Sequence, residues 1–127
     1  MKQENKKTIL VVDDTKPIRI MLLKRMEPEY RCLLASNPVE ALKLIKEYGS
    51  EIDIIISDYE MPKMNGYEFL KKLRSLKVNF PIIMVSGTLN KIRIEELIQL
   101  GVKKFMAKPV NITRLINEIR IIMEDSP

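Results

Sequence analysis

The chain has 127 residues, with 22 basic against 17 acidic side chains, and it contains one cysteine and no histidine. Without histidine, the chain can form neither a Ser–His–Asp triad nor a histidine-ligated zinc site. One cysteine allows no internal disulfide bond and no zinc site built from several thiolates. Any chemistry must therefore come from Asp, Glu, Lys, Ser, Thr or Tyr side chains, with or without a hard metal ion.

The length and the composition fit one globular domain. Apolar residues make up 46% of the chain and charged residues 31%, which is ordinary for such a domain. The longest apolar runs, such as residues 9–12, are far too short to cross a bilayer, and Asp13 and Asp14 interrupt the only candidate core of a signal peptide. We therefore expect a cytoplasmic protein outside the membrane, and a single thiol fits a reducing compartment.

The basic surplus lies in the second half of the chain. Residues 1–60 carry 10 basic and 11 acidic side chains, whereas residues 61–120 carry 12 basic and 4 acidic ones. Solvated helix faces explain such a surplus most simply. The alternative is a docking face for an acidic partner.

Short apolar runs alternate with segments in which apolar residues have helical spacing. The predicted elements, in chain order, are a strand at Thr8–Val12, a helix at Thr15–Glu27, a strand at Arg31–Ala35, a helix from Pro38 to about Gly49, a strand at Asp53–Ser57, a helix containing Phe69, Leu70 and Leu73, a strand at Pro81–Val85, a helix at Lys91–Leu100, a strand at Lys103–Ala107 and a helix after Asn111. Pro17, Gly101 and Asn111 are typical of the helix boundaries where they stand. This alternation implies a parallel sheet with helices on both faces and right-handed crossovers.

Polar side chains follow the ends of four predicted strands. Ligands of such sheets bind beyond the carboxyl ends of the strands, which meet at one edge. The side chains placed there are Asp13 and Asp14 after the first strand, Asp58 after the third, Ser86 after the fourth and Lys108 after the fifth.

Three carboxylates at one edge repel one another, so at least one pKa should rise unless a cation is bound. Oxygen ligands favour Mg²⁺ over zinc, and Mg²⁺ is commonly shared with phosphate oxygens. An aspartate can itself attack phosphorus and form an aspartyl phosphate. That reaction needs positioning and charge compensation more than proton transfer, and Lys108 and Ser86 can supply a charge and a hydrogen bond.

Four motifs, each at the end of a predicted strand, resemble the receiver domain of two-component response regulators. They are Val-Val-Asp13-Asp14, Ile-Ile-Ile-Ser-Asp58-Tyr-Glu-Met61-Pro62-Lys-Met-Asn65-Gly66, Met-Val-Ser86-Gly87 and Phe105-Met-Ala-Lys108-Pro109. The resemblance extends from Ile9 to about Met123. It implies a flavodoxin-like α/β fold, a doubly wound (βα)5 sheet with strand order 2-1-3-4-5, in a single receiver domain over residues 1–127 with a core of about 8–124.

The resemblance also implies a role for each acidic residue. Asp58 would accept a phosphoryl group from the phosphohistidine of a partner histidine kinase or histidine phosphotransfer protein, as in a phosphorelay. Asp14 and Asp58 would bind Mg²⁺ together with the backbone carbonyl of Glu60, and Asp13 would act mostly through bound water. The chain would then be a phosphorylation-controlled switch that assists only its own phosphorylation and dephosphorylation, and not an enzyme for an external substrate.

The switch implied by the resemblance involves residues of the last two strands. Lys108 would pair with Asp58 and then with the phosphate, while Ser86 moves toward the phosphate and Phe105 swings inward. The bond before Pro109 would be a cis peptide. Phe105 replaces the more frequent Tyr, and Gly87 leaves access to the phosphoryl group open.

The implied output is a change in affinity of the face formed by the fourth helix, the fifth strand and the fifth helix. The basic residues on this face predict an acidic protein partner, and they are Lys91, Arg93, Lys103 and Lys104. No nucleic-acid reading motif accompanies the charge, so direct DNA binding is not expected. We expect a monomer or a weak homodimer.

Several alternatives stay open at this stage. Asp14 could cap the first helix, and Phe105 could be static core. The chain could be the receiver part of a longer transcription factor or hybrid histidine kinase, or a degenerate receiver that is never phosphorylated. A phosphatase with an aspartyl nucleophile fits less well, because it would have Asp-x-Asp after the first strand and here the two residues are adjacent.

Overall fold

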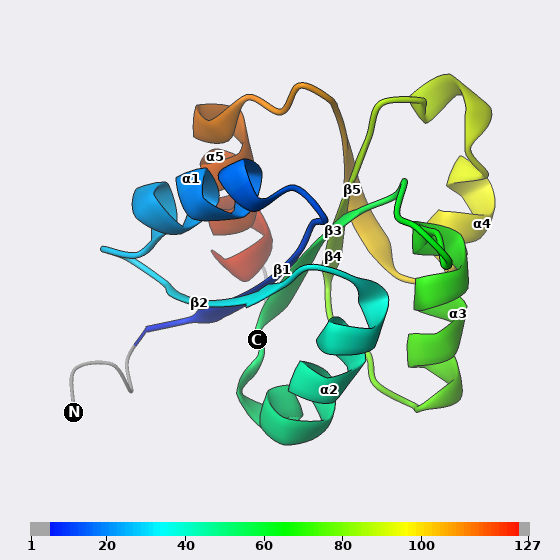
Figure 1. The fold of residues 1–127 in the computed structure, drawn as a ribbon, viewed down its shortest axis with the longest axis horizontal. Helices are drawn as coiled ribbons and strands as arrows, with labels where there is room; N and C mark the ends of the chain where they lie inside the picture. The colour runs from blue at the N-terminus through cyan, green and yellow to red at the C-terminus, as the bar shows by residue number, and fades with distance from the viewer. Residues whose placement is uncertain (1–5, 125–127) are drawn as a thin grey trace.

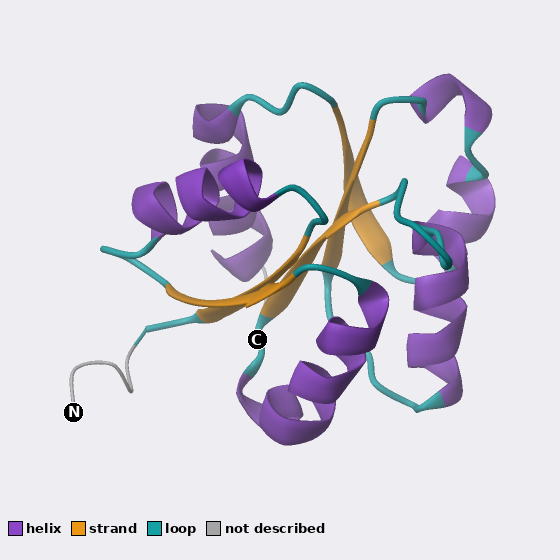
Figure 2. Cartoon of the chain, in the orientation of Figure 1, coloured by secondary structure: helices purple, strands orange, loops and turns teal. Residues whose placement is uncertain are grey.

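All five predicted strands and all five predicted helices are present in the computed structural model, which describes residues 6–124 (Figure 1, Figure 2). The elements are β1 (Thr8–Val12), α1 (Lys16–Met26), β2 (Arg31–Ala35), α2 (Pro38–Tyr48), β3 (Ile54–Asp58), α3 (Gly66–Ser75), β4 (Ile82–Ser86), α4 (Ile94–Gln99), β5 (Val102–Ala107) and α5 (Ile112–Glu124). The two ends of the predicted domain, residues 1–5 and 125–127, lie outside the described range. Within that range no helix has the length and apolarity that a bilayer crossing requires.

The strands form one parallel sheet in the order β2-β1-β3-β4-β5, which confirms the predicted topology. The register places Val12 opposite Ala35 on one side and Ser57 on the other. Asp58 in turn lies opposite Val85. The carboxyl ends of β1, β3 and β4 therefore lie side by side at one edge of the sheet.

Two hydrophobic cores cover the two faces of the sheet, because successive strand residues point to opposite faces. On one face, strand residues such as Leu10 and Ile55 pack with Phe69 of α3 and Leu97 of α4. α2 covers the same face, while α1 and α5 cover the other (Figure 1). The strands are buried on both sides, which explains their nearly unbroken apolar sequence.

Side-chain caps fix the starts of three helices. Asn37, Asn65 and Asn111 each accept a hydrogen bond from a backbone amide three residues later. Asn65 forms a complete capping box with Glu68, whose carboxylate accepts from the Asn65 amide at 2.9 Å.

α1 begins without such a cap. Its N-cap residue is Thr15, which makes no capping side-chain bond, so the alternative that Asp14 caps this helix is wrong. Asp13 is the residue that binds the start of the helix, because its Oδ1 accepts from the Thr15 amide at 2.7 Å. Asp14 stays exposed at the edge of the sheet.

α4 is shorter than predicted. The sequence predicts a helix at Lys91–Leu100, but a 3₁₀ turn at Leu89–Lys91 and an extended Ile92 come before the helix. Ile92 packs against the core beside α4, and the N-cap residue Arg93 makes no side-chain cap. The end is as predicted, since Gly101 takes a positive φ of 110° after the helix.

Candidate functional site

Asp58 lies at the centre of the sheet edge where β1, β3 and β4 end. It is the last residue of β3 and pairs with Val85 of β4, whereas the sequence predicts it just beyond the strand. Because it lies within the sheet, its side chain is almost fully buried, with 1% exposed.

Asp13 and Asp14 bring two further carboxylates to Asp58. One carboxylate oxygen from each of the three residues lies within 4.8 Å of the others. The Asp13 carbonyl accepts a hydrogen bond from Arg19 at 2.7 Å, and this contact holds the loop after β1 against α1. The structure thus brings together the three acidic residues that the sequence predicts at this edge.

The surroundings of Asp58 raise its pKa above the usual value for an aspartate and provide few hydrogen-bond donors to its carboxylate. Burial raises the pKa of Asp58 to about 6; Lys108 opposes this rise, and Asp13 and Glu60 add to it. The predicted rise of one pKa is therefore confirmed, although burial contributes more than repulsion. Among the described residues, none donates a hydrogen bond to Asp58 Oδ2. A buried carboxylate oxygen without a donor, beside two other carboxylates, fits a hard divalent cation.

Lys108 provides the positive charge of the site. Its Nζ lies 2.6 Å from Asp58 Oδ1, and its amide donates to the Ser86 carbonyl at 3.0 Å. The Lys108–Pro109 peptide is cis, as predicted. Burial disfavours the ammonium, but Asp58, together with Glu60 and Asp13, raises the pKa of Lys108 above its usual value, so the side chain is charged at neutral pH.

The Glu60 side chain forms a second polar cluster beside Asp58, with the residues that follow β4. Its carboxylate accepts hydrogen bonds from the Ser86 hydroxyl, the Thr88 hydroxyl and the Gly87 amide. Burial would raise the pKa of Glu60, but these hydrogen bonds and the charge of Lys108 hold it below its usual value. The resemblance implies that the Glu60 backbone carbonyl binds metal, but no local pattern in the sequence indicates these side-chain contacts.

Phe105 lies on β5, and Gly87 directly follows β4. Phe105 pairs with Met84 in the β4–β5 ladder and is half-buried against the core that contains α4. Its inward swing stays a prediction. A Cβ at Gly87 would meet no atom within 4 Å, which agrees with the open access predicted there.

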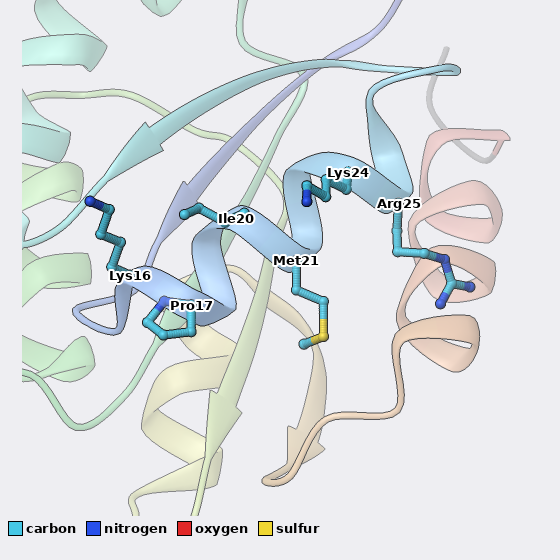
Figure 3. A pocket seen from close by; sticks show the side chains of 6 residues that line it. All are labelled: Lys16, Pro17, Ile20, Met21, Lys24 and Arg25. Carbon is cyan, nitrogen blue, oxygen red and sulfur yellow. The ribbon is translucent and has the colours of Figure 1, made fainter.

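α1 carries an apolar and basic surface close to the site, because the helix begins just after Asp13 and Asp14. Ile20 and Met21 are each 40% exposed. They line a shallow pocket together with Lys16, Pro17, Lys24 and Arg25 (Figure 3). Figure 3 also shows Arg25 extending toward α5, where its guanidinium contacts the Thr113 hydroxyl at 3.4 Å.

Comparisons with known proteins agree with this geometry. The receiver domain of the Francisella response regulator 1452 superimposes with a TM-score of 0.81 at 32% identity, over 94% of this chain and 98% of that one. The transcriptional regulatory protein PhoP of Bacillus subtilis, which is named for alkaline phosphatase synthesis, is 34% identical over 94% of this chain. The sensor kinase CckA of Brucella abortus is 30% identical over 92% of it. The chain spans only 50% of PhoP and 12% of CckA.

The model of the response regulator receiver domain family matches residues 9–120. That match covers most of the chain and includes every residue of the site described above. The chain therefore belongs to the family of response regulator receiver domains, the signalling switches of two-component systems.

Proposed function

We propose that Asp58 accepts a phosphoryl group from the phosphohistidine of a partner histidine kinase or histidine phosphotransfer protein, in the cytoplasm. The observation that carries this proposal is the buried Asp58 carboxylate, 2.6 Å from the Lys108 ammonium and beside two further carboxylates. Because residues 1–127 contain no histidine, the donor histidine lies outside them.

The residues of the site suit this transfer. An oxygen of Asp58 attacks phosphorus and a P–O bond forms, while the P–N bond breaks and the imidazole nitrogen keeps the electron pair. With a pKa of about 6, Asp58 is mainly ionised at neutral pH and needs no general base. The Lys108 ammonium lies where it can stabilise charge on the phosphoryl oxygens.

We assign a Mg²⁺ ion to Asp13, Asp14 and Asp58, with the backbone carbonyl of Glu60 as a further ligand. Bound Mg²⁺ supplies positive charge that offsets the carboxylates and the phosphoryl oxygens. Because a ligand that binds only the folded state stabilises it, Mg²⁺ should raise the melting temperature of the wild type more than that of Asp58→Asn. An equal rise in both would contradict Asp58 as a ligand.

We propose that the donor protein binds on α1. This helix begins next to the site, and its exposed Ile20 and Met21 are flanked by Lys16, Lys24 and Arg25. An amphipathic helix with acidic flanks would be complementary to this surface. Met21→Glu should slow transfer from a phosphohistidine protein but leave the reaction with acetyl phosphate unchanged, since the small donor needs no docking surface.

We propose that phosphorylation changes the affinity of the face formed by α4, β5 and α5 for an acidic protein. This face has exposed basic side chains beside an exposed apolar one, Ile98, and the exposed basic residues are Lys91, Arg93 and Lys103. Affinity for such a partner should fall as salt rises. An effector whose binding is insensitive to salt would contradict the predicted charge of the partner.

The test of the phosphoacceptor is incubation with acetyl phosphate and Mg²⁺, with intact-mass spectrometry of the wild type and Asp58→Asn. We expect one phosphoryl group on the wild type, none without Mg²⁺ and none on the variant. Phosphorylation of Asp58→Asn at the wild-type level would overturn the proposal. Continuous turnover of acetyl phosphate, with no accumulation of modified protein, would instead favour a phosphatase.

A second arrangement makes this chain the receiver part of a longer transcription factor or hybrid histidine kinase. It is favoured by the length of PhoP and CckA, in each of which the matching segment is half of the protein or less. The two arrangements have the same site chemistry and differ in the output. The length of the native reading frame decides between them.

A further inference from the structure

The carboxylate of Glu60 accepts three hydrogen bonds beside Asp58 and lies near one ammonium group. It accepts hydrogen bonds from the Ser86 hydroxyl, from the Thr88 hydroxyl at 2.7 Å and from the Gly87 amide at 3.1 Å. The Lys108 ammonium lies 3.7 Å from its Oε1. These contacts connect the loop after β3 to the segment after β4.

The hydroxyl of Ser86 uses its hydrogen and accepts a further hydrogen bond within this cluster. A hydroxyl has one hydrogen to donate, and Ser86 donates it to Glu60. The Ser86 oxygen also accepts from the Thr88 amide at 2.9 Å, and Ser86 is fully buried. While this arrangement lasts, Ser86 cannot donate to a group on Asp58.

Lys108 is shared between the two carboxylates in a similar way. Its Nζ lies 2.6 Å from Asp58 and 3.7 Å from Glu60. A phosphoryl group brings roughly −1.5 to −2 of charge and three strong acceptor oxygens. It would therefore compete with Glu60 for both the ammonium and the Ser86 hydroxyl. The Glu60 side chain is 38% exposed, so it can move into solvent.

We propose that Glu60 is a positioning residue, whose side chain holds the Ser86 hydroxyl away from Asp58 until a phosphoryl group displaces it. The inference rests on the proposed function, because it requires that Asp58 be phosphorylated. It gives the side chain of Glu60 a role separate from the metal ligand assigned to the backbone carbonyl. The resting state is stabilised by the Glu60 contacts, and phosphorylation replaces them.

The test is a double-mutant cycle on the binding of beryllofluoride, a phosphoryl analogue, in the presence of Mg²⁺. The proteins are the wild type, Glu60→Gln, Ser86→Ala and the double variant, and affinity is measured by NMR titration. Glu60→Gln keeps the shape of the side chain but removes its charge. Glu47→Gln, on the exposed side of α2, is the matched control for the loss of one negative charge.

We expect Glu60→Gln to bind beryllofluoride about tenfold more tightly than the wild type, because the Ser86 hydroxyl bonds a charged carboxylate more strongly, by roughly that factor, than the neutral amide oxygen of Gln. In the Ser86→Ala background the same substitution should change affinity by less than roughly threefold. Glu47→Gln should bind like the wild type. The amide proton resonance of Gly87 in the resting state should move in Glu60→Gln and stay in place in Glu47→Gln.

The outcomes separate the two proposals. An equal gain of affinity in both backgrounds would mean that Glu60 acts by charge repulsion alone, and it would overturn the positioning role, as would no gain at all. If the wild type fails to bind beryllofluoride, or if Asp58→Asn binds it equally well, the proposed function fails and the positioning role fails with it.

Discussion

Asp58 and Glu60 are two residues apart in the chain, but their carboxylates have opposite surroundings. Asp58 ends β3, is nearly fully buried and has Lys108 as its ion-pair partner. Glu60 lies in the loop that follows, is partly exposed and accepts three hydrogen bonds. Accordingly, burial raises the pKa of Asp58 to about 6, while donors hold the pKa of Glu60 below its usual value.

This difference shows how neighbouring carboxylates can have different roles: Asp58 is free to react, whereas Glu60 holds other side chains in place. A carboxylate with few donors keeps its lone pairs for a metal ion and for phosphorus. A carboxylate that many donors contact is a poor nucleophile, but it fixes the groups that contact it. Two residues of chain are enough to change one environment into the other, because β3 ends between them.

The largest expected effect comes from removing the one ion-pair partner of Asp58 among the described residues. Lys108→Ala should slow phosphorylation by acetyl phosphate about 100-fold or more, because the charge facing the phosphoryl oxygens is lost. Single-turnover rates by intact-mass spectrometry measure this. Lys104→Ala is the matched control, since Lys104 pairs with Glu118 on the same strand–helix unit, at 3.7 Å. A wild-type rate in Lys108→Ala would show that the ion pair has no part in the transfer.

The second prediction concerns the buried charge of Asp58 itself. The pKa of the Asp58 carboxyl is 3.8 in the unfolded chain and about 6 in the folded protein. Between pH 4 and 6 the folded protein therefore binds more protons than the unfolded chain. The free energy of unfolding should therefore fall by up to about 3 kcal/mol as pH rises from 4 to 7 without metal. Asp58→Asn should lack this fall. Urea titrations with a chelator present, at several pH values, compare the two proteins, and parallel pH profiles would contradict the prediction.

A third, smaller effect is expected at Gly66, which anchors the far end of the loop that carries Glu60. The Gly66 amide donates to the Tyr59 carbonyl at 2.8 Å, and a Cβ there would lie 2.8 Å from Met84 Sδ and 3.1 Å from Tyr59 Cα. Gly66→Ala should therefore lower the free energy of unfolding by about 1–3 kcal/mol. Gly87→Ala, where a Cβ meets open space, should change it by less than about 0.5 kcal/mol. Similar losses in both variants would contradict steric crowding as the cause.

The sequence was sufficient to predict the fold because the relevant signals are local. Each strand is a short apolar run, each helix has helical spacing, and parallel order follows from their alternation. The error at α4 arose because Ile92 is apolar and so fits a helical pattern, yet its side chain packs in the core from an extended backbone. The spacing of Asn65 and Glu68 is also that of a capping box, so the start of α3 was encoded locally as well.

For the site, the sequence predicted which residues meet but not how they share donors. Asp13, Asp14, Asp58 and Lys108 come together because parallel strands end at one edge, which is a property of topology. The contacts of Glu60 depend on how its loop folds across the end of β4, and no spacing within the chain encodes that. The closeness of Gly66 to Met84 is likewise a tertiary contact, which no local spacing indicates.

The smallest expected effect comes from removing one hydrogen-bond donor from Glu60, so that its carboxylate has fewer donors, as that of Asp58 does. Thr88→Val removes the hydroxyl that donates to Glu60 at 2.7 Å but keeps the amide that donates to Ser86. The pKa of Glu60 should rise toward its usual value, and the protein should lose about 0.5–1.5 kcal/mol of stability. NMR titration of the Glu60 side-chain carboxyl carbon measures the first change and urea unfolding the second. Thr113→Val, which removes an exposed hydroxyl that contacts Arg25 at 3.4 Å, is the control. An unchanged pKa of Glu60 would mean that Ser86, Gly87 and Lys108 hold it low without Thr88, and that the Thr88 hydroxyl has no part in the resting cluster.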